Sequence, residues 1–233
     1  MKGPLVSIVV PVYNSEAFLR ETLDSVFALD YEPFEVIVVD DGSTDASAAI
    51  AQSYPDVHYV RQENRGPGEA RNVGIGVSRG EFVAFVDSDD VVLSHKLSAQ
   101  VGYLLDHPDV TATLGRQEWI TPPPDAVPDL VWGDLDGITP ISLVIRRTAL
   151  IEVGCFNPAL RGPEDVELLV RLREGGYRFL VIPEIVMRRR YHGENLVAGK
   201  RDAPLPLELL KAKLDRARTG EPSQRTPRTG SAS

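Results

Sequence analysis

Residues 34–45 read FEVIVVDDGSTD, an apolar run that stops at two adjacent acids, Asp40 and Asp41. An uninterrupted run rich in β-branched side chains is typical of a strand buried on both faces of a parallel sheet. Gly42 and the polar residues after it end the strand and favour a turn into a helix. The segment therefore predicts one strand–turn–helix unit of an α/β fold.

Similar units occur on both sides of this one. Leu5–Val10 and Glu81–Val86 are further apolar runs, closed by Pro11 and by the acids that begin at Asp87. The other strands that we predict are 57–60, 110–114, 141–145, 178–182 and 185–190. Helices are expected after Asn14 or Ser15, after Ser43 or Thr44, from Pro67 and from Ser94, and at 148–153 and 163–173. This alternation predicts an open, mostly parallel sheet flanked by helices.

The domain organisation follows from composition. A chain of 233 residues suits one α/β domain, which we place at 1–200. Within it, 121–128 is rich in proline and is expected to be a loop, with Trp119 and Trp132 nearby. An amphipathic helix is predicted at 201–218, and a disordered tail at 219–233.

Charge and cysteine content exclude some functions. The formal charge of −9 argues against nucleic acid as a partner, and the single cysteine, Cys155, fits a reducing compartment. No apolar run is long enough to span a bilayer, so we expect a cytoplasmic protein. Basic residues outnumber acids from Lys200 to Ser233, which makes weak, peripheral contact with a membrane surface an alternative to a solvated tail.

Acidic side chains gather at predicted strand ends. Asp40 and Asp41 end one strand, and Asp87-Ser88-Asp89-Asp90 ends another, so these carboxylates would share the carboxyl edge of the sheet, where α/β folds bind ligands. Single acids such as Asp45 or Asp90 often serve only as helix caps or turn formers. The cluster is different, because adjacent carboxylates repel one another unless a cation compensates. Oxygen ligands indicate Mg²⁺ or Mn²⁺, together with a diphosphate substrate.

Three further motifs each allow two interpretations. Gly66-Pro67-Gly68 with Arg71 could bind an anion or could only pack closely. Glu164-Asp165 could be catalytic or could cap a helix, and His192 could be a ligand or a surface residue.

Taken together, these motifs resemble those of the family 2 glycosyltransferases, which adopt the GT-A fold. The resemblance covers residues 5–196 and is carried by VSIVVPVYN (6–14), FEVIVVDDGSTD (34–45), NRGPG (64–68), ARN (70–72), FVDSDD (85–90), VGCF (153–156), Glu164-Asp165 and Tyr191-His192. Two positions depart from the family pattern. Cys155 replaces a common second glycine, and the usual Tyr-Arg-x-His ending is here Arg190-Tyr191-His192.

The resemblance implies a donor-binding half at about 5–115, an acceptor and catalytic half at about 116–200, and a role for each motif. The implied donor-site residues are Pro11, Tyr13, Asp40 and Asp41 near the base, Gly68 and Arg71 on the donor side, and Asp87 and Ser88 at the ribose. The implied metal ligands for Mn²⁺ or Mg²⁺ are Asp89, Asp87 and His192. Asp165, paired with Glu164, matches the catalytic base. An unperturbed aspartate has a pKa of about 3.9, so it would be ionised at neutral pH without a large shift.

The implied activity is transfer of a sugar from a nucleotide-sugar donor to an acceptor hydroxyl of a glycan, a lipid or a small molecule, by an inverting displacement. Two alternatives remain at this point. A non-catalytic nucleotide-sugar-binding protein would not need the Glu164-Asp165 pair. A sugar-phosphate nucleotidyltransferase would carry a glycine-rich signature near the first strand, where this chain has Pro11-Val12-Tyr13-Asn14. The same departure argues against a nicotinamide-dependent enzyme.

Overall fold

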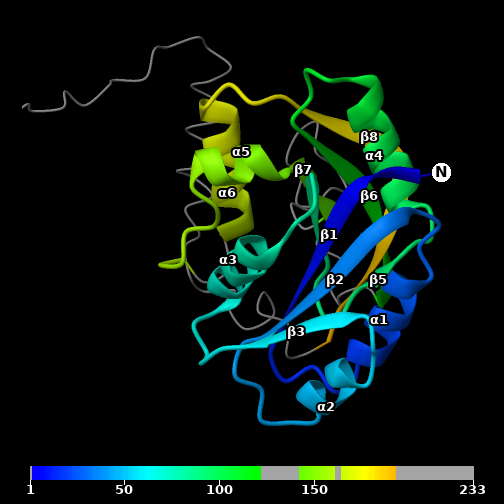
Figure 1. Cartoon of the computed structure of the whole chain (residues 1–233), viewed down its shortest axis with the longest axis vertical. Coiled ribbons are helices and arrows are strands. Elements are labelled where there is room, and N and C mark those ends of the chain that lie inside the picture. Colours follow the sequence, from blue (N-terminus) through cyan, green and yellow to red (C-terminus); the bar gives the residue numbers. More distant parts are fainter. Residues whose placement is uncertain (1, 122–141, 161–163, 193–233) are drawn as a thin grey trace, which may run out of the picture. The chain divides into compact units, whose positions relative to one another are not determined.

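A computed structural model describes residues 2–121, 142–160 and 164–192 of the chain. Within them lies an eight-stranded sheet with the order β3-β2-β1-β4-β7-β6-β8-β5 (Figure 1). The strands are β1 (Lys2–Val12), β2 (Glu32–Asp40), β3 (Val57–Arg61), β4 (Phe82–Phe85), β5 (Val91–Val92), β6 (Ala112–Thr121), β7 (Val144–Arg146) and β8 (Phe179–Arg190). The helices are α1 (Leu19–Phe27), α2 (Ser47–Gln52), α3 (Pro67–Val77), α4 (Lys96–Asp106), α5 (Arg147–Val153) and α6 (Glu164–Glu174).

The sheet is mostly parallel, as predicted. Parallel pairs are β1–β2, β1–β4, β2–β3 and β6–β8. β7 is antiparallel to both β4 and β6, and β5 is antiparallel to β8. Because β1, β2 and β4 run in the same direction, their carboxyl ends share one edge of the sheet, and the loops that carry the acidic motifs begin there.

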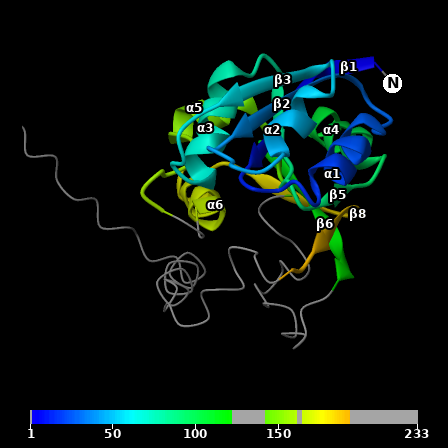
Figure 2. The same cartoon turned by 90° about the horizontal axis from the view of Figure 1, so that it is seen from below.

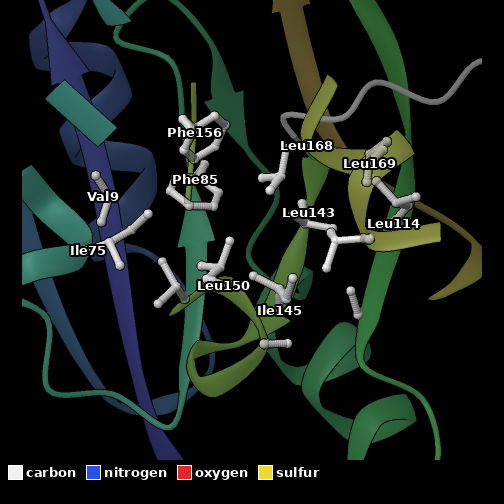
Figure 3. Close-up of a cluster of buried hydrophobic side chains, with 14 of the residues drawn as sticks. Val9, Ile75, Phe85, Leu114, Leu143, Ile145, Leu150, Phe156, Leu168 and Leu169 are labelled. Atoms are coloured by element: carbon white, nitrogen blue, oxygen red, sulfur yellow. The ribbon is translucent and has the colours of Figure 1, made fainter. Parts of the chain in front are cut away.

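Helices cover both faces of the sheet, which explains the uninterrupted apolar runs. Along β1, Val9 belongs to the core beneath α3, α5 and α6, whereas Ile8 and Val10 belong to the core beneath α1 and α4. Figure 3 shows the first core, in which Phe85 and Phe156 meet edge to face with ring centroids 5.2 Å apart. Figure 2 shows the two helical groups on opposite sides of the sheet.

The small residues Ala70, Gly74 and Gly76 in the sequence of α3 predict that this helix packs closely on the sheet. The expectation holds for Gly74, where an added Cβ would lie 2.4 Å from Val9, and Ala70 is fully buried. It is wrong for Gly76, because an added Cβ there would meet nothing within 4 Å. The helix turns Gly76 away from the sheet.

Several predicted boundaries are wrong. The two strands expected at 178–182 and 185–190 form one strand, β8, whose pairing with β6 shifts register between Leu114 and Arg116, so the ladder tolerates Pro183. β5 was missed because two residues carry no periodic signal. α1 begins at Leu19 without a side-chain cap, and the carbonyl of Ser15, not its hydroxyl, accepts the first bonds of this turn.

The other helix starts also differ from the predictions. α4 begins at Lys96 after His95, rather than being capped by Ser94. α2 begins at Ser47, later than the expected start after Ser43 or Thr44. Asp45 accepts the backbone N–H of Ser47 at 2.9 Å, which confirms the turn-forming alternative for that acid.

Some predicted features lie outside the described residues. These are the proline-rich segment from 122 onward, Trp132, the helix expected at 201–218 and the tail at 219–233. Among the described helices, none has the length and apolar character needed to cross a bilayer.

Candidate active site

Three carboxylates lie together directly after β4. Asp87, Asp89 and Asp90 each offer an oxygen within 4.8 Å of the others. The turn that carries them closes with a hydrogen bond from the backbone N of Asp90 to the carbonyl oxygen of Asp87, 3.1 Å. The side chains of Asp87 and Asp89 are 26% and 22% exposed, whereas that of Asp90 is 2% exposed. Asp87 and Asp89 therefore form the accessible side of this acidic turn.

α1 and the loop before it hold the acidic turn in place. The hydroxyl of Thr22 lies 3.0 Å from the carbonyl oxygen of Ser88 and 2.8 Å from that of Asp90, so it donates to the backbone of the turn. The hydroxyls of Ser15 and Ser88 are 2.6 Å apart. From the sequence we expected Ser15 only as a helix cap, and Thr22 was missed. Nothing in local spacing links a helix position to a turn 66 residues away.

Burial and mutual repulsion disfavour ionisation of the acids in the acidic turn. Burial raises the pKa of Asp89, and Asp87 raises it further, while His192 opposes the shift. Burial raises the pKa of Asp90 to about 8, although Arg189 opposes that shift. A divalent cation would relieve this repulsion, and carboxylate oxygens are the ligands that Mg²⁺ and Mn²⁺ prefer. The donor set fits the metal expected from the sequence.

His192 approaches the acidic turn from the end of β8. Its Nε2 lies 2.9 Å from Oδ2 of Asp89. The backbone N of Arg190 donates to Oδ1 of Asp90 at 3.1 Å, and Nε of Arg190 donates to the carbonyl oxygen of Asp89 at 3.3 Å. These bonds join the end of β8 to the acidic turn. The imidazole is therefore within reach of a cation that Asp89 would hold.

Arg71 connects the acidic turn to α6. Its guanidinium donates to Oδ1 of Asp87 and to Oε1 of Glu164, both at 2.9 Å, and it lies 5.4 Å from the centre of the Phe156 ring. The side chain is 6% exposed. Burial alone would lower the pKa of Arg71, but Asp87 and Glu164 outweigh it and raise that pKa. The arginine stays charged and ties together two segments that are far apart in the sequence.

The two acids at the start of α6 have different surroundings. Glu164 is 3% exposed, and its carboxylate is bound to Arg71. Asp165 accepts the backbone N–H of Val166 at 2.7 Å. Burial raises the pKa of Asp165 to about 6, against the opposing charge of Arg71 and with the support of Glu164. At neutral pH Asp165 is largely ionised, so its carboxylate can accept a proton, whereas Glu164 is held in an ion pair.

The loop before α3 is organised by Asp41. Its carboxylate accepts the backbone N–H groups of Arg65 and Gly66, both at 2.8 Å, and the side-chain amide of Gln62 at 2.6 Å. Because the N–H of Gly66 is already bonded, this glycine does not offer it to an external anion. A Cβ added at Gly68 would lie 3.4 Å from Cγ of Glu164. The bonded N–H of Gly66 argues against anion binding at that glycine, and Gly68 lies in ordinary contact with Glu164.

The remaining donor-site candidates lie at the ends of β1 and β2. Pro11 is buried in β1, and Tyr13, directly after the strand, is 52% exposed. Asp40 is fully buried, and its carboxylate accepts from the hydroxyl of Tyr59 at 2.6 Å and from Arg61 at 2.9 Å. Asp40 therefore faces β3, while Tyr13 offers an accessible ring at the edge where the acidic turn lies.

Comparisons with known proteins identify the family and the fold of this chain. Residues 7–154 match the family described as glycosyl transferase family 2. An uncharacterized glycosyltransferase of Rickettsia felis is 35% identical over 82% of this chain, which spans 35% of that relative's length. The structure of S. aureus TarS 1–349 in complex with UDP-GlcNAc superposes with a TM-score of 0.70 at 24% identity, over 92% of this chain and 66% of that one.

A second solved structure has the same fold. The mannosyltransferase PcManGT from Pyrobaculum calidifontis, in complex with GDP-Man and Mn²⁺, gives a TM-score of 0.65 at 23% identity, over 96% of this chain and 66% of that chain. The matched family covers β1 to α5, which includes the acidic turn and Arg71. The chain belongs to glycosyltransferase family 2.

Proposed function

We propose that this protein transfers a sugar from a nucleotide-diphosphate-sugar to an acceptor hydroxyl, with a divalent cation and with inversion at the anomeric carbon. One observation carries the proposal: the buried Arg71 bonds both to Asp87 of the acidic turn and to Glu164, the neighbour of Asp165. A candidate metal site and a candidate base thus belong to one connected cluster, as a transfer reaction between two bound substrates requires.

The metal-binding role falls to Asp89, with Asp87 and His192 as further ligands. The accessibility of Asp87 and Asp89 and the 2.9 Å approach of His192 to Asp89 support this set. When bound, Mn²⁺ or Mg²⁺ would neutralise charge on the departing nucleoside diphosphate. Asp90 is the least accessible acid of the three, and its contact with the backbone of Arg190 suits it to holding the turn.

The donor would lie along the shared edge of β1, β2 and β4. We assign the nucleotide base of the donor to the surroundings of Pro11, Tyr13 and Asp41, with Asp40 behind them. The other donor-site residues in this proposal are Gly68, Arg71, Asp87 and Ser88. Two proteins of the same fold were solved with UDP-GlcNAc and with GDP-Man, which supports a nucleotide-sugar donor but names two different bases.

Asp165 is the proposed base that removes the proton from the acceptor hydroxyl. Its pKa of about 6 supports the role, because a base whose pKa lies near the working pH combines ionisation with proton affinity. Such a group contributes roughly 10²–10⁴-fold to a rate. Glu164 would assist indirectly, by holding Arg71. The alternative of a non-catalytic binding protein has no use for a carboxylate tuned in this way.

The acceptor is assigned to the second half of the chain. Residues 116–139 and the C-terminal region are the proposed determinants of acceptor choice, because the first half is committed to the donor. We also propose the division into a domain at 1–200, a helix at 201–218 and a tail at 219–233, with the basic residues after Lys200 as an occasional membrane contact of a cytoplasmic enzyme. The glycan, lipid or small molecule that accepts the sugar is open.

The test measures binding and slow hydrolysis of a panel of nucleotide-sugars with Mn²⁺, with Mg²⁺ and with a chelator. We expect one donor to be recognised only with metal and its nucleoside diphosphate to be released. Release of pyrophosphate from a nucleoside triphosphate and a sugar phosphate would favour a nucleotidyltransferase. Recognition of no donor would contradict the transferase proposal.

Two variants separate the proposed roles. Asp165→Asn should keep donor binding and lose transfer, whereas Asp89→Ala should weaken metal-dependent donor binding. Asp56→Asn changes an exposed acid away from the cluster and should behave as wild type. Equal loss of donor binding in Asp165→Asn and Asp89→Ala would contradict the separation of roles.

A further inference from the structure

Phe18, the residue before α1, packs against the chain at the end of β8. Its ring stacks on the imidazole of His192, with centroids 4.7 Å apart and an angle of 29° between the planes. The guanidinium of Arg190 lies 5.1 Å from the centre of the same ring. Stacked rings and cation–aromatic contacts are both favourable. Since residues 190 and 192 are two positions apart in an extended segment, one aromatic ring holds that segment through both.

A second contact from α1 fixes the same segment. Glu21, one turn after Phe18, accepts from Nη2 of Arg190 at 2.6 Å. Arg190 also donates to the carbonyl oxygen of Asp89, so its guanidinium joins α1 to the acidic turn. Thr22, the next residue of the helix, donates to the turn backbone at Ser88 and Asp90. The first turn of α1 therefore contacts both the acidic turn and the segment that carries His192.

We propose that Phe18 is a positioning residue of the metal centre, whose ring aims the imidazole of His192 at the cation site beside Asp89. An imidazole that rotates freely loses conformational freedom when it binds a cation, and a stacked one has lost much of it beforehand. Phe18 itself has no group that could bind a metal or exchange a proton. The proposal rests on the metal-dependent function proposed above, and it adds a residue that the sequence motifs do not single out.

The experiment measures the affinity of the full chain for Mn²⁺ alone, by titration calorimetry or by loss of the free-ion electron paramagnetic resonance signal. The proteins are the wild type, Phe18→Leu, His192→Ala and the double variant. We expect Phe18→Leu to weaken Mn²⁺ binding by about tenfold, as loss of a residue that supports a metal ligand commonly does, and His192→Ala, which removes the ligand itself, to weaken it by at least as much. The double variant should bind no more weakly than His192→Ala, because Phe18 acts only through that imidazole.

Two controls separate positioning from general packing. Phe27 lies at the other end of α1 and stacks on Tyr54 with ring centroids 5.6 Å apart and planes at 7°. Phe27→Leu thus removes a stacking contact from the same helix, and it should leave the Mn²⁺ affinity within about twofold of wild type.

The second control is Phe18→Tyr, which keeps the aromatic ring and should bind Mn²⁺ with the affinity of the wild type. If Phe18→Leu does not fold, as judged by its melting curve, Phe18→Met replaces it, since methionine keeps apolar volume without a ring.

The outcomes distinguish the two levels of the proposal. Losses that add in the double variant, or wild-type affinity in Phe18→Leu, would overturn the role of Phe18 while leaving the metal centre intact. Full Mn²⁺ affinity in His192→Ala would overturn it as well. A wild-type protein that binds no Mn²⁺ would contradict the metal-dependent function and this inference together.

Discussion

Two buried cations lie on opposite faces of the same sheet, and their partners differ. Arg71 of α3 donates to two carboxylates, those of Asp87 and Glu164, at 2.9 Å each. Lys96, the first residue of α4, donates to the neutral oxygens of Gln100 and Ser142 at 2.8 and 2.9 Å. No ion pair of Lys96 with a described residue accompanies these bonds.

This difference determines which cation keeps its charge. Burial alone would lower the pKa of both groups. For Arg71 the two carboxylates more than compensate, and the pKa is raised. For Lys96 burial lowers the pKa to about 7. Arg71 therefore contributes a permanent positive charge beside the candidate active site, whereas Lys96 contributes mainly hydrogen bonds that hold the chain before β7 against α4. In this protein, the buried basic side chain that contacts carboxylates keeps its positive charge, and only such a group contributes that charge to the candidate active site.

Removing Arg71 should have the largest effect. Arg71→Met leaves the buried Glu164 and the partly buried Asp87 without their shared partner, and breaking a buried pair in this way typically costs about 3–5 kcal/mol. The free energy of unfolding in urea measures the loss. The matched control is Arg79→Met, whose side chain is 78% exposed and paired with Glu35, and it should cost about 1 kcal/mol or less. Similar losses in both variants would contradict the special status of Arg71.

Lys96 should give a smaller effect that depends on pH. Its folded pKa of about 7 lies below the ordinary value of 10.5, so between these values the unfolded chain binds more protons than the folded one. The stability of the wild type should therefore rise with pH across this window, and Lys96→Met should lose that rise. At the alkaline end Lys96→Met should be less stable than wild type by about 1–3 kcal/mol, because Gln100 loses a partner.

Urea unfolding at the two ends of the window checks this prediction. Gln100→Leu is the control, since it removes a neighbour of Lys96 but keeps the titrating amine, and it should retain the rise with pH. Parallel pH profiles for the wild type and Lys96→Met would show that Lys96 is charged in the folded protein, and the contrast with Arg71 would then fail.

The sequence predicted the part of the molecule that depends on local pattern. Apolar runs that end at Pro11 or in acids indicated strands buried on both faces, so β1, β2 and β4 and the acidic turn at Asp87 were expected. Such a pattern is strong because burial on both faces leaves few polar positions inside the strand, of which Ser7 in β1 is one. A pattern of that kind has no counterpart in β5, which is two residues long, or in β8, which was predicted as two strands at 178–182 and 185–190.

Contacts between distant segments could not be predicted in the same way. Arg71 and Glu164 are 93 residues apart, and each was singled out, but their ion pair depends on how α6 packs against α3. The stacking of Phe18 on His192 could not be predicted either, because such a contact produces no periodic sequence pattern in either segment. Asp41 was predicted as a donor-site residue, while its bonds to Arg65 and Gly66 show that its carboxylate also shapes a loop.

The smallest predicted effect concerns the acidic limb of the pH profile of kcat/KM for the transfer reaction. If Asp165 is the base, kcat/KM should rise with pH through about 6 and then level off, because the carboxyl must lose its proton to act. Glu164 raises the pKa of Asp165 and Arg71 lowers it. Glu164→Gln removes the neighbouring negative charge but leaves Arg71 in place, so the limb should move to lower pH by less than about one unit.

A pH series of kcat/KM at saturating metal measures this shift, with Glu167→Gln as the control. Glu167 lies in the first turn of α6 as Glu164 does, but it pairs with Arg171, and it is not among the groups that chiefly set the pKa of Asp165. The acidic limb of the pH profile of Glu167→Gln should lie at the same pH as that of the wild type. A limb that also stays in place in Glu164→Gln would mean that burial alone sets the pKa of Asp165. The ion pair of Arg71 with Glu164 would then hold α3 and α6 together without tuning the base, and Arg71 would resemble Lys96 more closely than its carboxylate partners suggest.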